Sequence, residues 1–193
     1  MTGSRFAATI CAAGLVSVIA AIGEARALTV VVANGAAEIA LRVGATGATI
    51  STVSFAVAGA TAGTGTPVVG TTNAAAGSAQ APNFGTACGA NTVRIWARAR
   101  SPVAASRTAT LTVNGSGTLV SGANSIPITD FDWVTSGGTE IASGAFSGAA
   151  SQSLLMFPNS AEVSVCLQYR FLNTTVYPSG TYTGQIIYNL LMP

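Results

Sequence analysis

The chain has 193 residues, of which only 7% are charged: eight are Lys or Arg, six are Asp or Glu, and none is His. Without histidine, the Ser-His-Asp and Cys-His nucleophile arrangements are impossible, and the common zinc sites lose their usual nitrogen ligand. Every basic residue is an arginine, so a Schiff-base lysine and a P-loop lysine are excluded as well. The composition therefore predicts a non-enzymatic protein that uses no metal and no cofactor.

The N-terminus has the order of a secretory signal peptide. A short basic segment, Met1–Arg5, precedes the apolar run Phe6–Ile22, and Ala25-Arg26-Ala27 supplies an A-x-A cleavage site. The apolar run is slightly short for a helix that spans a bilayer with about 20 residues, so an uncleaved anchor is the weaker alternative. We expect residues 1–27 to be removed, and the mature chain to cross a periplasm and reach the cell surface or the medium.

Residues 28–193 are predicted to form one domain of short strands. Apolar and polar residues alternate with a period of two, turn signals such as Asn34-Gly35 separate the runs, and no helical period follows residue 27. The expected strands are, in chain order, Leu28–Ala33, Glu38–Val43, Thr49–Ala58, Asn91–Arg100, Arg107–Val113, Thr118–Val120, Ile126–Val134, Gln152–Phe157, Ala161–Leu172 and Thr181–Leu191. This pattern indicates an all-β fold, an antiparallel Ig-like β-sandwich of about eight to nine strands.

Two segments between the strands are expected to be loops. Gly59–Gly89 is rich in Ala, Gly, Thr and Ser and has no period, which predicts a long flexible loop with a short strand at Pro67–Gly70. Ile141–Ala149 is predicted to be a shorter loop, in which the side chain of Phe146 can fill a gap in the core.

The mature chain holds two cysteines, Cys88 and Cys166, because Cys11 leaves with the predicted signal peptide. A pair of cysteines in an exported chain favours a disulfide. Two separate thiols are the alternative, since positions far apart in the sequence need not be neighbours in space.

One expected strand has a basic face that contains an aromatic residue. Because side chains alternate along a strand, four residues share this face: Arg94, Trp96, Arg98 and Arg100. Such a strip could bind a glycan or an anionic polymer. The alternative is a solvated sheet face on which the arginine stems cover Trp96. The formal net charge of only +2 argues against a nucleic-acid partner.

Two other polar patterns are weaker indications of a functional site. Asp130 and Asp132 are two residues apart on one expected strand, so they would share a face and could serve a glycosidase or hold Ca²⁺, although a solvated face is the simpler interpretation. Asn114-Gly115-Ser116 and Asn173-Thr174-Thr175 match N-glycosylation acceptors, a pattern that arises easily by chance in a chain rich in Ser and Thr.

The C-terminal region carries a resemblance to a known family. The ending PSGTYTGQIIYNLLMP resembles the G-x-Y-[ST]-G-x-[IV]-x-[YLF] ending of bacterial fimbrial, or pilin-type, subunits and related surface β-sandwiches. The preceding order, IPITDFDWV, then a Gly-rich stretch, then QSLLMF, is similar to the matching region of the alpha-class fimbrial major subunits. The resemblance covers roughly residues 126–193. It implies an incomplete Ig-like sandwich that receives an N-terminal strand from the next subunit.

The resemblance also implies roles for particular residues. Leu28–Ala33 would be the donated strand, with the side chains of Leu28, Val30 and Val32 inserted. The closing strand would present Tyr182, Ile186, Tyr188 and Leu190, and it would dock a periplasmic chaperone. Gly180, fourteenth from the end, lies where chaperone–usher subunits often have a glycine.

The lead hypothesis is therefore an exported structural or adhesive surface protein, a fimbrial-type subunit that forms a homopolymer by strand donation. The alternative is a monomeric secreted β-sandwich that binds a glycan or an anionic polymer through the face of Arg94, Trp96, Arg98 and Arg100.

Overall fold

The computed structural model describes residues 38–44, 51–74, 87–101 and 107–193, all of which belong to a unit spanning Gly35–Pro193. Met1–Asn34 is a separate unit outside the described residues, and it contains the predicted signal peptide and the predicted strand Leu28–Ala33. In the described residues, no helix has the length and hydropathy needed to cross a membrane.

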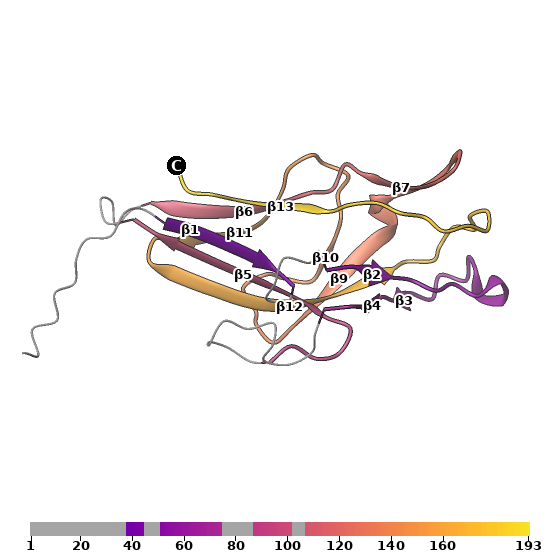
Figure 1. The fold of residues 1–193 in the computed structure, drawn as a ribbon, viewed down its shortest axis with the longest axis horizontal. Helices are drawn as coiled ribbons and strands as arrows, with labels where there is room; N and C mark the ends of the chain where they lie inside the picture. The colour runs from indigo at the N-terminus through magenta and orange to yellow at the C-terminus, as the bar shows by residue number, and fades with distance from the viewer. Residues whose placement is uncertain (1–37, 45–50, 75–86, 102–106) are drawn as a thin grey trace, which may run out of the picture. The chain divides into compact units, whose positions relative to one another are not determined.

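The described residues form thirteen short strands and two 3₁₀ turns, so the predicted all-β class is confirmed (Figure 1). Every pairing between these strands is antiparallel. The strands are β1 (Glu38–Val43), β2 (Val53–Ser54), β3 (Val68–Val69), β4 (Thr71–Thr72), β5 (Val93–Arg100), β6 (Thr108–Asn114), β7 (Thr118–Ser121), β8 (Asn124–Pro127), β9 (Phe131–Ser136), β10 (Gly144–Ala145), β11 (Gln152–Pro158), β12 (Ala161–Phe171) and β13 (Ile187–Leu191). The 3₁₀ turns are η1 (Gly59–Thr61) and η3 (Ile128–Asp130).

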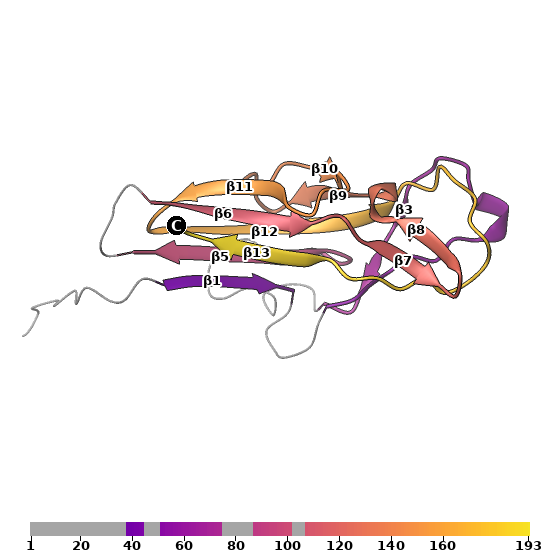
Figure 2. The ribbon, with the colours of Figure 1, turned by 90° about the horizontal axis from the view of Figure 1, so that it is seen from above.

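Two sheets make up most of the unit (Figure 2). The larger has the order β1-β5-β12-β9-β10, with β3 paired to the end of β12, and the smaller has the order β11-β6-β13. Two further two-stranded pairs, β2-β4 and β7-β8, complete the set of strands. An isolated bridge between Val120 and Thr183 ties β7 to the segment that leads into β13.

The core lies between the two sheets because both present an apolar face. On β5 the buried apolar face consists of Val93, Ile95, Ala97 and Ala99. The cluster continues into neighbouring residues of β12 in the same sheet and residues of β6 in the other sheet: Val163, Val165, Leu167, Ala109, Leu111 and Val113. Full burial of one such aliphatic side chain is worth about 1.5–3 kcal/mol, so this layer supplies the main driving force for folding.

Phe146 fills a gap in the core, as predicted for the loop that carries it. Its ring centroid lies 5.0 Å from that of Trp133, in an edge-on arrangement, and 6.4 Å from that of Tyr169. The Trp133 indole N–H donates a hydrogen bond to the Ala142 carbonyl at 2.9 Å. The loop is therefore held by the inward-packed ring and by several hydrogen bonds, among them those from the Thr135 hydroxyl to the Ile141 carbonyl at 2.7 Å and from the Thr135 N–H to the Ser143 hydroxyl at 2.9 Å.

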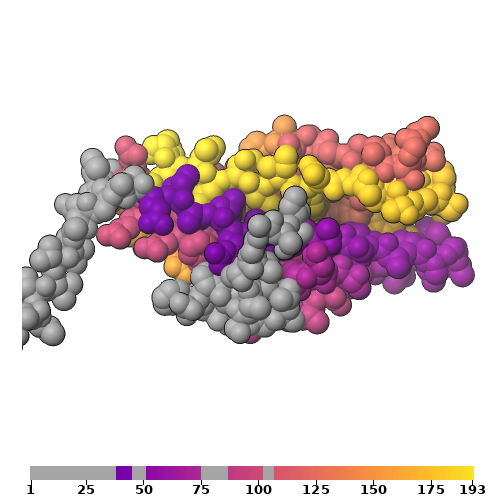
Figure 3. Space-filling view, in the orientation of Figure 1, coloured from indigo at the N-terminus to yellow at the C-terminus, as the bar shows by residue number. Residues whose placement is uncertain are grey.

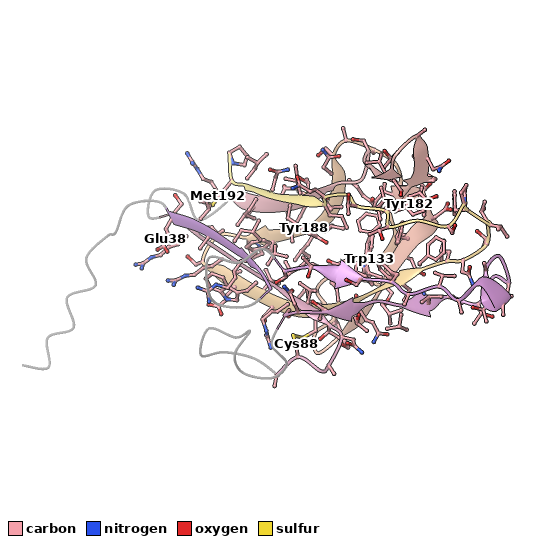
Figure 4. The ribbon with its side chains drawn as sticks, turned by 45° about the vertical axis from the view of Figure 1, so that its right-hand side comes forward. Glu38, Cys88, Trp133, Tyr182, Tyr188 and Met192 are labelled. Carbon is pink, nitrogen blue, oxygen red and sulfur yellow. A yellow bond between two sulfur atoms is a disulfide. The ribbon has the colours of Figure 1, made fainter. Side chains whose placement is uncertain are left out.

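Two tyrosines join the sheets through their hydroxyl groups. The oxygens of Tyr169 on β12 and Tyr188 on β13 lie 2.5 Å apart. Figure 4 labels Tyr188 on β13. Burial raises the pKa of Tyr169 to about 12 and raises the pKa of Tyr188 well above 10. Both hydroxyls therefore stay protonated at neutral pH and keep the hydrogen bond between the layers.

Cys88 and Cys166 form a disulfide, which confirms the predicted pair. Their Cα atoms are 5.6 Å apart, although 78 positions separate them in the sequence. Gly137 lies beside the bond with φ +66°, and a Cβ there would come within 3.2 Å of the Cys166 sulfur. The disulfide thus fixes the chain just before β5 to the middle of β12.

Three predicted strands differ from those observed. Ile126–Val134 is divided by η3, because Pro127 has no backbone N–H to continue the ladder and Ile128 turns into the core. In the described part of Thr49–Ala58, only Val53–Ser54 pairs as a strand. Thr181–Leu191 begins as a strand only at Ile187, since Thr183 pairs with Val120 outside the smaller sheet.

Replacing both disulfide cysteines, Cys88→Ala with Cys166→Ala, should lower the free energy of unfolding by about 4 kcal/mol. The reason is that the cross-link closes a long loop in the unfolded chain. Urea unfolding followed by tryptophan fluorescence measures the change, with wild type reduced by dithiothreitol as the comparison. Equal midpoints for oxidised wild type and the variant would contradict the prediction.

The free energy of unfolding should fall as the pH rises from about 10 to about 12. Both tyrosines have folded-state pKa values above the unfolded value of about 10, so their stabilisation is complete below pH 10 and is lost toward the folded pKa. Tyr169 alone should account for about 1 kcal/mol at pH 11. Urea titrations at pH 8, 10 and 11 measure the slope. A variant with Tyr169→Phe and Tyr188→Phe should show a shallower slope, and an unchanged slope would refute the assignment.

Candidate functional site

The edge of β13 is the first candidate site, because it ends the smaller sheet next to the edge of the larger one. Among the strands that the structure describes, β13 pairs with β6 alone, and β1 pairs with β5 alone. The two edge strands nevertheless come close to each other, and Figure 3 shows their atoms side by side on one face. No β-bridge joins them among the described residues. Among the described strands, each of these two edges thus has no further strand paired to it, and the two edges lie close together.

The four edge strands differ in how they hinder pairing with another chain. Charged residues, proline, bulges and short length all discourage such pairing. β1 carries Glu38 and Arg42, β10 has only two residues, and β11 has a register shift between Ser153 and Leu155 and ends at Pro158. β13 has none of these features over its sequence IYNLL. It is the edge best suited to accept a further strand.

The side chains beside this open edge are incompletely covered. Ile39, Leu41 and Val43 form the apolar face of β1, yet Ile39 is 47% exposed and the other two are only half-buried. On β13, Leu190 is buried, whereas Tyr188 remains half-buried. The core is thus closed by β5 and β6 in its middle and left partly open between β1 and β13.

The residues predicted to contact another subunit have different positions. Leu28, Val30 and Val32 lie outside the described residues. Ile186, Tyr188 and Leu190 contact the core, the last two from β13 and the first from just before it. Tyr182 lies outside β13, where its hydroxyl donates to the Pro178 carbonyl at 2.8 Å and its ring packs near Tyr177.

Gly180, singled out by the sequence, has a local structural role. A Cβ at this position would lie 2.6 Å from the hydroxyl oxygen of Ser121 on β7. The Ser121 hydroxyl would have to rotate to make room for such a Cβ, because the next nearest atom, the Ser121 Cβ, lies at 3.4 Å.

The second candidate is the outer face of the larger sheet. Strand pairing places Arg42 and Ser164 beside Trp96, Ala40 and Glu162 beside Arg98, and Glu38 beside Arg100. We call the charged and aromatic members of this set the arginine face: Glu38, Arg42, Trp96, Arg98, Arg100 and Glu162. Three of them, Glu38, Arg42 and Glu162, belong to neighbouring strands, so the alternation along one strand could not predict them.

Arg94 does not belong to the exposed face, in contrast to the sequence prediction. Its side chain is only 1% exposed, and it donates a hydrogen bond from Nη1 to the Ser164 hydroxyl. Burial lowers the pKa of its guanidinium from the usual value. Arg94 is a structural residue of the β5–β12 pair, while Trp96, Arg98 and Arg100 are partly exposed.

An open depression of about 360 Å³ lies at one end of the arginine face. It is lined by Arg98, Arg100, Ser160, Ala161 and Glu162. The Trp96 indole N–H donates to Glu162 Oε1 at 2.7 Å, which holds this carboxylate toward the indole. Within the described residues, neither Arg98 nor Arg100 forms an ion pair.

Asp130 and Asp132 are bound to different partners and do not share an open site. Arg170 donates to Asp132 from Nε at 2.9 Å and from Nη2 at 2.5 Å, a two-point ion pair between β12 and β9. The Tyr177 hydroxyl donates to Asp130 at 2.5 Å. No group of three side chains suited to a metal occurs in the part of the chain that the structure describes.

Asn173 is a buried residue whose side chain hydrogen-bonds to several parts of the chain, and it is not an exposed glycosylation acceptor. It is 1% exposed, and its side-chain nitrogen donates to the carbonyls of Thr61 and Thr66 at 2.7 and 3.3 Å. Its side-chain oxygen accepts from the Gly63 N–H at 2.9 Å. These bonds fasten the η1 turn to the end of β12, so the amide nitrogen that would carry a glycan is buried.

The two candidate sites lie on different strands of one unit: an unprotected edge at β13 and a cationic face formed by β1, β5 and β12. Comparison with protein-family models, with curated proteins and with solved structures finds no match to this chain.

Proposed function

We propose that this protein is an exported structural subunit with an Ig-like sandwich that assembles into a homopolymer at the bacterial surface by strand donation. The supporting observation is the edge of β13, which has no charge, proline or register shift to prevent pairing. A donated strand would hydrogen-bond to this edge and extend the smaller sheet. The function is structural and requires no catalytic group.

The partly open side of the core suits a donated strand. A strand added beside β13 would reach the half-exposed apolar face of β1, formed by Ile39, Leu41 and Val43. Leu28, Val30 and Val32 alternate along Leu28–Ala33 and supply apolar side chains at the required period of two. Burial of one such side chain is worth about 1.5–3 kcal/mol, and backbone pairing adds to this.

The same edge accounts for the expected chaperone. A subunit with an uncovered edge strand is prone to uncontrolled pairing before assembly. A periplasmic chaperone that pairs with β13 would protect the edge during transit, and the next subunit's donated strand would then replace it. The predicted signal peptide at residues 1–27 delivers the chain to that compartment.

The substitution Val30→Asp should abolish the polymer, because a carboxylate cannot be buried unpaired in the core of the next subunit. Native protein extracted from the cell surface is compared on SDS gels with and without boiling. Wild type should give a ladder of multiples that collapses on boiling, and Val30→Asp should give only the single subunit.

Thr29→Asp is the matched control, because it adds the same charge to the same strand on the opposite face. It should keep the ladder. A ladder that persists in Val30→Asp would show that Leu28–Ala33 is not the donated strand. A single band for wild type in both lanes would exclude assembly by strand donation.

The substitution Leu191→Lys should shorten or remove the ladder, because lysine on an edge strand discourages pairing with another chain. Met156→Lys is its control: the two side chains are 62% and 64% exposed, and they lie on the two opposite edge strands of the same sheet. Both variants should unfold within about 0.5 kcal/mol of wild type, as is usual for surface positions. Equal loss of polymer in both variants would contradict a role specific to β13.

A further inference from the structure

We propose that the arginine face binds a carboxylated glycan, with the guanidinium groups of Arg98 and Arg100 holding the carboxylate groups. The inference does not depend on strand donation, because the arginine face and the edge of β13 belong to different sheets. The ligand class is a carboxylated glycan, and the arginines that contact it are the exposed ones.

The cationic groups are available for a ligand. Among the described residues, Arg170 forms an ion pair with Asp132. Arg42, Arg98 and Arg100 form no ion pair with a described residue. Glu162 is the register partner of Arg98, but its carboxylate is held by the Trp96 indole at 2.7 Å. The register partner of Arg100 is Glu38, and these two also form no ion pair. Each guanidinium can therefore donate its two-pronged set of hydrogen bonds to an external anion.

The spacing of these groups fits a ligand with repeated charges. Arg98 and Arg100 are two residues apart on β5, so their Cα atoms are separated by about 6.8 Å and their side chains leave the same face. The third arginine, Arg42, extends the row on the neighbouring strand β1. A chain of sugars that bears successive carboxylates can contact more than one of these guanidiniums at once.

The face also contains groups that suit sugar hydroxyls. Glu162 and Glu38 are exposed carboxylates, and Ser160 lines the depression with its hydroxyl. Carboxylates accept hydrogen bonds from hydroxyl groups, whereas they repel a dense polyanion such as a nucleic acid or an anionic membrane. The mixture of arginine and glutamate therefore favours a ligand in which hydroxyl groups stand beside the carboxylates over one whose surface is anionic throughout.

The shape of the face agrees with a sugar-sized ligand. The depression of about 360 Å³ beside Arg98 and Arg100 falls in the lower range of small-ligand sites. Trp96 lies in the next row of side chains and presents part of its ring surface. An aromatic ring at such a site gives apolar contact to a ligand, while its own polar atom keeps its hydrogen-bond partner. The indole N–H already donates to Glu162, one of the residues that line the depression.

The test is binding of the purified full-length protein to polygalacturonate, measured by calorimetry at low and at high salt. Arg98→Gln and Arg100→Gln should each weaken binding about tenfold or more, as expected for the loss of a charge-assisted hydrogen bond. Arg107→Gln is the control, because it removes an equal charge from an exposed residue that precedes β6 and is not among those that line the depression. The control should bind within about twofold of wild type, and all variants should keep the wild-type melting temperature.

Two further probes decide the ligand chemistry. Fully methyl-esterified polygalacturonate has the same backbone without the charge and should not bind, whereas equal binding would overturn the role of the carboxylate. Dextran sulfate should bind more weakly than polygalacturonate, and tighter binding through the same arginines would replace the carboxylated ligand by a sulfated one. Absence of wild-type binding to polygalacturonate, or equal loss in Arg107→Gln, would overturn the proposal.

Discussion

The structure depends on the pairing and cross-linking of β12, which crosses the centre of the larger sheet. It pairs with β5 along its first part, with β9 along its second part and with β3 at its end. From the same strand, Cys166 forms the disulfide, Arg170 pairs with Asp132, and Tyr169 reaches the other sheet through Tyr188. A buried strand with covalent, ionic and hydrogen-bonded links on several sides leaves few alternative registers, because any slip would break several of these links together.

The smaller sheet, in contrast, has an exposed apolar surface and no charged residue on its strands. None of its three strands contains a charged residue, and three large apolar side chains, Met156, Ile187 and Leu191, are exposed on them. β11 is disrupted by a register shift and ends at Pro158, but β13 continues without interruption to Leu191. Exposed apolar surface next to an unprotected edge is costly for a protein that remains alone. The same surface would be buried in a subunit whose edge is covered by a neighbouring subunit.

The distribution of charge separates the two proposed roles. On the described strands, the charged residues occur in the larger sheet, and those of β1, β5 and β12 gather on its outer face. Assembly through the edge of β13 would leave that face in solvent. A polymer of such subunits would repeat the arginine face along its length, so that weak binding of a glycan by each copy would add up through multivalency.

The amino-acid sequence by itself determined the strand class, the buried face of β5, the limits of β1 and the residues able to form the disulfide, because alternation and composition are local properties. It also predicted Phe146 as a core residue, since an isolated large ring in a polar loop has few other places to go. Only the tertiary structure decided that Arg94 is buried and that the Asn173 side chain hydrogen-bonds to several parts of the chain. It also decided that Glu38, Arg42 and Glu162 complete the arginine face. Burial and neighbours across strands depend on register between segments far apart in the chain, and no local pattern encodes that register. The place of β13 at the end of the smaller sheet, among the described strands, was decided in the same way, because strand order depends on pairing between segments far apart in the chain.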